Sequence, residues 1–347
     1  MTHRPRRLHP LEREALRDHG AALRQRRAVL RGLGIGTAGL ATGGLGFLAG
    51  CSSDDKGSSG STGSSTTTAP VGAAEDVVPY DPDTPYWLQG NFVGVTKEET
   101  ATDLTVKGSL PPELSGLFVR NGSNPEPGVE TLHWFLGDGM IHGVRLEGGK
   151  ASWYRNRYVQ TPIRKSGKDL LNFGKVPGGE NSQSNVALIH HGGKLLAVGE
   201  VGWPWELSTD DLSTVGAWNF GGRLGATMTA HPKIDPETGR MHFFGYDILE
   251  PKITYYAAAP DGTLDVATTI PVDAVSMIHD FAITDRHAVF WLGPVLFGSD
   301  PKAMYPDMPF HWDPEGPCRV GVMSLDGDGS DLRWVDIPPC FVFHGYN

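Results

Sequence analysis

The feature that most constrains the fold is a succession of short β-prone runs separated by tight-turn signals, which starts near Val77. Gly-Gly, Asp-Gly and Pro-Glu-Thr-Gly segments favour the tips of β-hairpins. Six tips lie near residues 148, 192, 238, 261, 286 and 328. A four-stranded propeller blade takes roughly 40–50 residues and contains hairpins at about half that interval, whereas sandwich turns come every ~8–12 residues. The pattern predicts an all-β propeller over 77–347, with room for about five or six blades.

Charge is unevenly distributed along the chain. Residues 1–50 contain nine Arg against three Asp or Glu, whereas the whole chain has a net charge of -10, so residues 51–347 carry -16. A basic head before an acidic body is typical of a targeting segment. The acidic body argues against nucleic acid as a partner.

Residues 1–50 have the order of elements found in an export signal. The pair Arg26–Arg27 precedes a weakly apolar, Gly-rich stretch that ends in Leu-Ala-Gly-Cys at Cys51. This segment resembles a bacterial twin-arginine signal peptide joined to a lipoprotein processing box, with Cys51 as the lipidated residue. An ordinary transmembrane anchor is the weaker alternative, because the stretch is short and diluted by Gly and Thr. The expected location is extracytoplasmic, with a lipid anchor in the cell membrane.

Residues 51–76 are rich in Ser, Thr and Gly and are predicted to be a flexible linker, since they cannot bury apolar surface. If Cys51 carries the lipid, Cys318 and Cys340 are the remaining cysteines. Cys340 lies beside an apolar run, which favours a buried free thiol. A disulfide between these two cysteines is the alternative.

Three of the 13 histidines, His231, His279 and His344, stand in similar settings, each after an apolar or small run. The "CFVFHGYN" segment around His344 has the composition of a buried strand end. Equivalent inner-strand positions of successive propeller blades face the central axis, so histidines at about blade spacing can converge on one metal ion. The alternative is that each is a separately hydrogen-bonded core histidine.

Glu200 follows the apolar run "LLAVG", where an ionised carboxylate is costly unless it is paired. A metal-ligating imidazole usually donates its other N–H to such a carboxylate, which makes Glu200 a candidate outer partner. An exposed acid at a strand end is the alternative. Asp280 is a poor partner for His279, because adjacent side chains of an extended chain point to opposite sides.

Several segments from about Tyr86 onward resemble the carotenoid cleavage oxygenases, a family that includes apocarotenoid oxygenases, lignostilbene dioxygenases and a vertebrate retinoid isomerase. "GSLPPELSGLFVRNGSNPEP" is similar to the family's opening motif, and "HWFLGDGMIHGVRLEGG" to its second block, with Leu136 where an acidic residue is commoner. "AHPKID", "IHDFAIT" and "FHGYN" are similar to the segments that carry its first three iron-binding histidines.

The resemblance implies a seven-bladed β-propeller with Fe(II) on its axis, held by four histidines. His231, His279 and His344 match the first three ligands, and Glu200 matches a carboxylate that hydrogen-bonds a ligating imidazole. The fourth histidine lies beyond the third in the family. The expectation is therefore a C-terminally truncated chain whose closing blade is missing.

The implied activity is O2-dependent cleavage of a conjugated carbon–carbon double bond of a carotenoid or apocarotenoid to two carbonyl products. A stilbenoid substrate and a non-catalytic propeller lipoprotein are the alternatives. Trp203, Trp205 and Phe220 are candidates to line an apolar substrate tunnel, although core packing is their expected role. Lys165 and Lys168 are candidates to meet a phenolate, with a plain surface position as the simpler interpretation.

Overall fold

The computed structural model describes residues 80–345, apart from 103, 127, 130, 132, 172, 174–177, 226 and 299–309. These residues belong to the unit Asp76–Asn347. The predicted signal peptide over 1–50, the lipidation site Cys51 and the linker over 51–76 lie outside the described residues. Among the described residues, no helix has the length and apolar character needed to cross a membrane.

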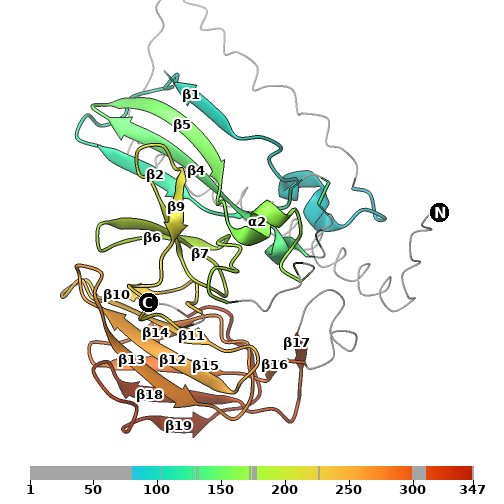
Figure 1. The fold of residues 1–347 in the computed structure, drawn as a ribbon, viewed down its shortest axis with the longest axis vertical. Helices are drawn as coiled ribbons and strands as arrows, with labels where there is room; N and C mark the ends of the chain where they lie inside the picture. The colour runs from blue at the N-terminus through green and yellow to red at the C-terminus, as the bar shows by residue number, and fades with distance from the viewer. Residues whose placement is uncertain are drawn as a thin grey trace, which may run out of the picture. The chain divides into compact units, whose positions relative to one another are not determined.

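The first sheet has the order β1-β5-β4-β2, with β3 paired to β4 (Figure 1). Its strands are β1 (Glu99–Thr102), β2 (Gly116–Arg120), β3 (Ser123–Asn124), β4 (Asp138–Glu147) and β5 (Lys150–Tyr158). Helical turns flank this sheet: η2 (Tyr86–Leu88), η3 (Gly90–Phe92), η4 (Trp134–Leu136) and α2 (Pro162–Ser166). Strand β1 is thus an edge strand of this sheet and pairs with β5, while β2 forms the opposite edge.

Three four-stranded sheets follow this five-stranded one along the chain. The second comprises β6 (Ala187–His191), β7 (Lys194–Val198), β8 (Trp205–Leu207) and β9 (Thr214–Ala217). The third comprises β10 (Lys233–Ile234), β11 (Met241–Tyr246), β12 (Lys252–Ala258) and β13 (Leu264–Pro271). The fourth comprises β14 (Phe281–Ile283), β15 (His287–Leu292), β18 (Arg319–Ser324) and β19 (Arg333–Asp336). In the sequence between β15 and β18, β16 (Val295–Phe297) and β17 (Phe310–Trp312) form a separate two-stranded sheet.

The predicted turn positions are confirmed. Each of the six falls between two strands that pair antiparallel: β4 and β5, β6 and β7, β10 and β11, β12 and β13, β14 and β15, and β18 and β19. Gly192 has φ 56 and Gly193 φ 73, which is the left-handed conformation that a tight hairpin demands. The all-β prediction is confirmed as well.

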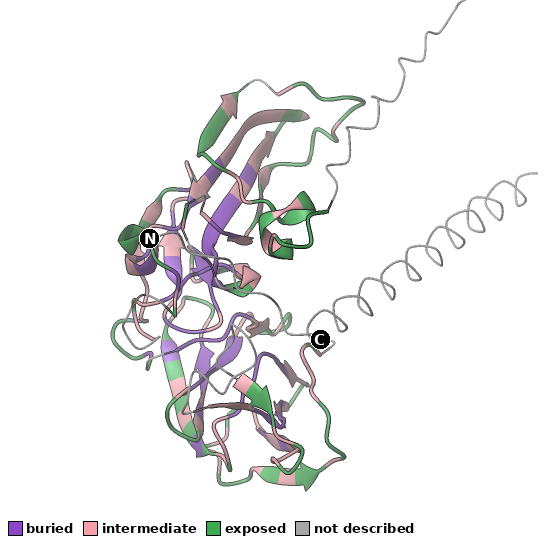
Figure 2. Cartoon of the chain, turned by 90° about the vertical axis from the view of Figure 1, so that its right-hand side faces the viewer, coloured by how far each residue is buried: buried purple, intermediate pink, exposed green. Residues whose placement is uncertain are grey.

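The core consists of layers between consecutive sheets. Ile141 of the first sheet packs with Leu195 and Leu207 of the second, while Phe243 of the third packs in a cluster with Leu196 of the second. The third and fourth sheets share the largest layer, which includes Phe244, Tyr255, Phe281 and Phe290, all fully buried. Every residue of β11 is buried, because both faces of that strand are covered. Figure 2 shows buried residues along the inner strands, with exposed residues at turns and also on some strands.

The aromatic residues near Glu200 are packing residues, as expected. Trp205 and Phe220 are buried, and Trp203 packs against the second core layer while its Nε1 donates to Gly225 O at 2.6 Å. Lys165 and Lys168 are exposed, in and just after α2.

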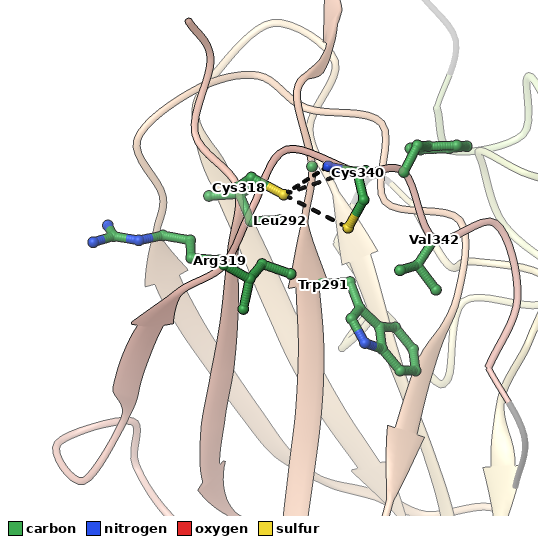
Figure 3. Close-up of a pocket in the computed structure, with 9 residues that line it drawn as sticks. Trp291, Leu292, Cys318, Arg319, Cys340 and Val342 are labelled. Carbon is green, nitrogen blue, oxygen red and sulfur yellow. Dashed lines mark hydrogen bonds between the residues drawn. The ribbon is translucent and has the colours of Figure 1, made fainter. Parts of the chain in front are cut away.

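Two expectations about the end of the chain are wrong. Residues 341–345 form no strand, and His344 is exposed rather than buried, because the backbone of this segment pairs with no strand in the described part of the chain. Cys340 is an exposed free thiol rather than a buried one, since Pro338 and Pro339 lead it out over the surface. Its Sγ lies 3.9 Å from that of Cys318, which is also a free thiol (Figure 3).

Candidate metal centre

Three histidines from distant parts of the sequence meet at one point. The side-chain nitrogens that His231, His279 and His344 offer all lie within 4.8 Å of one another. The Nε2 atoms of His231 and His279 are 2.8 Å apart. The ring of His344 is centred 4.8 Å from that of His231 and 5.0 Å from that of His279. We call these three residues the histidine cluster.

His231 and His279 occupy equivalent places in the fold. Each precedes the first strand of its sheet, with one residue between, so that His231 lies before β10 and His279 before β14. Buried apolar residues anchor the chain on the N-terminal side of each histidine, with Ala230 before His231 and Ile278 before His279. The proline after His231 favours an extended backbone at that histidine. The same local design therefore presents two imidazoles from adjacent sheets.

Glu200 holds the imidazole of His279 from the side opposite the cluster. Its Oε2 accepts a short hydrogen bond from His279 Nδ1, and its Oε1 accepts one from the hydroxyl of Tyr246 at 2.6 Å. Burial, and then the negative charge of Glu200, keep the pKa of Tyr246 well above its usual range, so the hydroxyl remains a donor. With the proton on Nδ1, the lone pair of His279 Nε2 faces the other histidines.

The electrostatics of the cluster favour the neutral form of His231. Burial, and then the neighbouring His279, lower the pKa of His231 to about 4. A neutral imidazole is the form that binds metals, and Fe, Zn, Cu and Ni all accept this ligand. An N–H···N hydrogen bond between the two rings accounts for the 2.8 Å separation of their Nε2 atoms, and a metal ion can take the place of that proton. The donor set therefore fits a divalent transition metal.

Aromatic rings lie against the cluster. The ring of Phe343 is centred 4.3 Å from that of His279 and 5.0 Å from that of His344. Phe135, from η4, lies 6.3 Å from Phe343. The cluster therefore has apolar surroundings on the side of Phe343.

Two other buried histidines, His242 and His191, have hydrogen-bond partners away from the cluster. His242 Nδ1 bonds the hydroxyl of Tyr255 at 2.7 Å, and His191 Nε2 bonds Gly239 O at 3.1 Å, as expected for packing residues. Among the described residues, the histidine cluster is the single grouping of three or more His, Cys, Asp or Glu side chains arranged to hold a metal.

Comparison with known proteins places the chain in a family. A sequence profile of the RPE65 family, described as retinal pigment epithelial membrane protein, matches residues 92–347. A carotenoid cleavage oxygenase of Mycobacterium tuberculosis is 35% identical over 325 residues, which cover 79% of this chain and 62% of that protein. The chain belongs to the carotenoid cleavage oxygenase family.

Plant and bacterial members of the carotenoid cleavage oxygenase family extend the likeness. A carotenoid 9,10(9',10')-cleavage dioxygenase of Phaseolus vulgaris is 36% identical and covers 77% of this chain and 55% of its own length. The crystal structure of a lignostilbene dioxygenase from Pseudomonas brassicacearum superposes with a TM-score of 0.65 at 32% identity, covering 75% of this chain and 57% of that one. A cobalt-substituted ACO from Synechocystis gives a TM-score of 0.60 at 26% identity, over 72% of this chain and 58% of that one.

The chain thus spans about three-fifths of the length of the curated relatives and solved structures that it matches. Sequence reasoning brought forward the three histidines and Glu200, and the structure places all four together. It did not anticipate Tyr246 or Phe343 at this site. Neither carries a local signal, because an aromatic in a strand or apolar run is indistinguishable from core in sequence.

Proposed function

We propose that the complete protein is an iron(II)-dependent dioxygenase that cleaves a conjugated carbon–carbon double bond of a carotenoid or apocarotenoid to two carbonyl products. The observation that carries this proposal is the meeting of His231, His279 and His344, with Glu200 on the far nitrogen of His279. The names of the relatives, carotenoid cleavage oxygenase and dioxygenase, supply the reaction class.

In this proposal the three histidines hold the iron through neutral nitrogens. Glu200 keeps the proton of His279 on Nδ1, so that Nε2 stays available as a ligand. When bound, Fe(II) supplies the O2 chemistry that protein side chains lack. No protein acid or base is needed, and the chain's contribution is to hold the ligands and to bind the substrate.

The aromatic neighbours of the cluster suit an apolar substrate. Phe343 lies against His279 and Phe135 lies against Phe343, so the two rings offer an apolar surface on which a polyene can pack. An extended conjugated hydrocarbon fits these contacts better than a charged metabolite does.

We propose that the complete fold is a seven-bladed propeller and that a fourth histidine completes the ligand set from sequence not included in this chain. The succession of one five-stranded and three four-stranded antiparallel sheets supports the propeller, because such sheets form its blades. The first strand of the third sheet and that of the fourth each follow a ligand, which agrees with ligands placed on the inner edge of successive blades.

A stilbenoid is the second candidate substrate, because the lignostilbene dioxygenase superposes on three-quarters of this chain at 32% identity. The decisive experiment uses the full-length protein loaded with Fe(II), with an apocarotenoid and a hydroxystilbene assayed side by side for O2 consumption and carbonyl products. Cleavage of the apocarotenoid supports the first proposal, and cleavage of the stilbene alone replaces it with the second. A protein that retains no iron and consumes no O2 with either substrate is a non-catalytic propeller.

We also propose that the protein is exported and anchored to the cell membrane through a lipid on Cys51. The Arg26–Arg27 pair and the Leu-Ala-Gly-Cys sequence support this location. Such an anchor would keep the enzyme beside a bilayer in which carotenoids dissolve. A Cys51→Ser variant is expected to move from the membrane fraction to the soluble extracytoplasmic fraction, whereas an unchanged distribution contradicts the anchor.

A further inference from the structure

A buried carboxylate, Asp280, joins three segments of the chain. Its side chain is 2% exposed. Its Oδ1 accepts hydrogen from the backbone N–H of Phe281 at 2.8 Å and lies 3.0 Å from Lys233 Nζ, while its Oδ2 accepts from the backbone N–H of Gly345 at 3.0 Å. Both oxygens are therefore in use, and a cation balances the charge, as burial of a carboxylate requires.

Every partner of Asp280 lies within two residues of a member of the histidine cluster. The pairs are Lys233 with His231, Asp280 with His279, and Gly345 with His344. Neighbouring side chains of an extended segment point to opposite sides, so His279 reaches the cluster while Asp280 reaches the backbone behind it. One side chain thus touches all three segments that present the imidazoles.

We propose that Asp280 is a positioning residue that sets the spacing of the histidine cluster by clamping the segments of His231 and His344 to that of His279. The proposal rests on the metal-binding function proposed above and extends it to a residue that touches no metal. Asp280 acts through Lys233 on one side and through Gly345 on the other.

The contact to Gly345 is the critical one. Residues 341–345 form no strand, and within the described residues the Gly345–Asp280 bond is the only hydrogen bond that this segment makes. His231 and His279 are placed by the strands that follow them, and Gly345, the residue next to His344, is the point at which Asp280 holds the third segment. Loss of the clamp should therefore release His344 first.

The clamp can be tested without any metal. In Asp280→Asn and Asp280→Ala, the amide of Gly345 is expected to exchange with solvent at least ~10-fold faster than in the wild type, because a charge-assisted hydrogen bond has been removed. Asp273→Ala is the matched control, since Asp273 is an exposed carboxylate paired with Arg319. Unchanged exchange at Gly345 in both Asp280 variants would overturn the clamp. If Asp280→Ala does not fold, the Asn variant, which keeps the size of the side chain, still decides.

A second measurement tests the effect on metal binding. Co(II) is titrated into the wild type, Asp280→Asn, His344→Ala and the double variant, with affinity read by chelator competition and ligand geometry by visible absorption. Asp280→Asn is expected to weaken Co(II) binding by ~10-fold with a changed spectrum, but by less than ~2-fold when His344 is already absent, because the two changes act through one segment. Equal weakening in both backgrounds overturns the proposal.

The two outcomes separate the clamp from the proposed function. If the wild type binds no Co(II) or Fe(II), the metal function fails, and the exchange rate of Gly345 alone decides whether Asp280 holds the segment. If the wild type binds metal and Asp280→Asn binds it equally well with an unchanged spectrum, the metal function stands and the positioning role is wrong.

Discussion

The histidine cluster is assembled in two different ways. His231 and His279 each lie two residues before the first strand of a four-stranded sheet, directly after buried residues of the core. His344 comes from residues 341–345, a half-buried segment without strand pairing, in which His344 itself is exposed. We call residues 341–345 the His344 segment.

The difference shows that the same chemical role can rest on different physical support. The sheet-borne histidines are fixed by strand register and by a hydrophobic layer, which resist local opening. The contacts of the His344 segment include the Gly345 amide on Asp280, the ring of Phe343 on His279 and the close packing of Gly345 on Trp291. Cys340, just before the segment, approaches Cys318. The four predictions below address this contrast, from the largest expected effect to the smallest.

The largest effect is expected in the layer under the sheet-borne histidines. Phe290 is fully buried and packs on Phe244 and Phe281, which follows Asp280. Phe290→Ala should lower the free energy of unfolding by ~3–5 kcal/mol through lost burial and a cavity. Chemical denaturation of the full chain measures this change.

Phe341→Ala is the matched variant in the His344 segment. Phe341 is only half-buried, so the same truncation should cost less than ~1.5 kcal/mol, in line with its smaller burial. Similar losses for the two variants would show that the His344 segment is as much a part of the core as the fourth sheet, and the contrast would be wrong.

The second prediction compares the ligands themselves. His279→Ala should weaken Co(II) or Fe(II) binding by more than ~100-fold, because it removes a fixed ligand and leaves Glu200 without its imidazole. This loss exceeds the ~10–100-fold that is typical when only a hydrogen-bond partner of a ligand is removed. His344→Ala should weaken it by only ~10-fold, since part of the binding free energy of that ligand is already offset by ordering a loosely held segment. A larger loss for His344 than for His279 contradicts the contrast.

The sequence predicted the sheet-borne half of the site better than the other half. Turn residues such as Gly192–Gly193 act locally, so the hairpins could be placed from composition alone. Glu200 stood out because a carboxylate after an apolar run needs a partner. Both signals lie within a few residues of the feature that they predict.

The His344 segment was misjudged because its state depends on distant neighbours. Its aromatic residues suggested a buried strand, but strand formation requires a partner strand, and an apolar sequence does not specify one. Likewise, the position of Asp280 beside His279 indicated only that its side chain points away. Its contacts with Lys233 and Gly345 arise from the tertiary fold and carry no sequence signal.

The third prediction concerns the support of His279. Glu200→Gln keeps an oxygen that can accept from His279 Nδ1 but removes the negative charge, so metal affinity should fall by ~10–100-fold. Glu206→Gln is the control, because Glu206 forms an ion pair with Lys194 on the neighbouring strand and does not contact the cluster. Chelator competition measures both variants, and an equal effect of the two would contradict a specific role for Glu200.

The smallest effect is expected from the two thiols beside the His344 segment. Cys318 Sγ and Cys340 Sγ are 3.9 Å apart, so a small movement allows a disulfide (Figure 3). Oxidised glutathione would accept the two electrons and two protons of the thiols and leave as two thiols, closing the loop from β18 to the His344 segment. The bond should restrict that segment and raise Co(II) affinity by ~2–5-fold, because less conformational entropy is then lost when His344 binds.

Oxidation of Cys318 and Cys340 also tests whether the His344 segment is held less firmly than the sheet-borne histidines. If the His344 segment is loosely held, oxidation should improve metal binding in the wild type and have no effect in Cys340→Ser, with thiol titration confirming the bond. In His344→Ala, oxidation should still form the disulfide but should leave metal affinity unchanged. Equal gains with and without His344 would mean that the disulfide acts through the fourth sheet, in which case the segment is not the flexible member of the site.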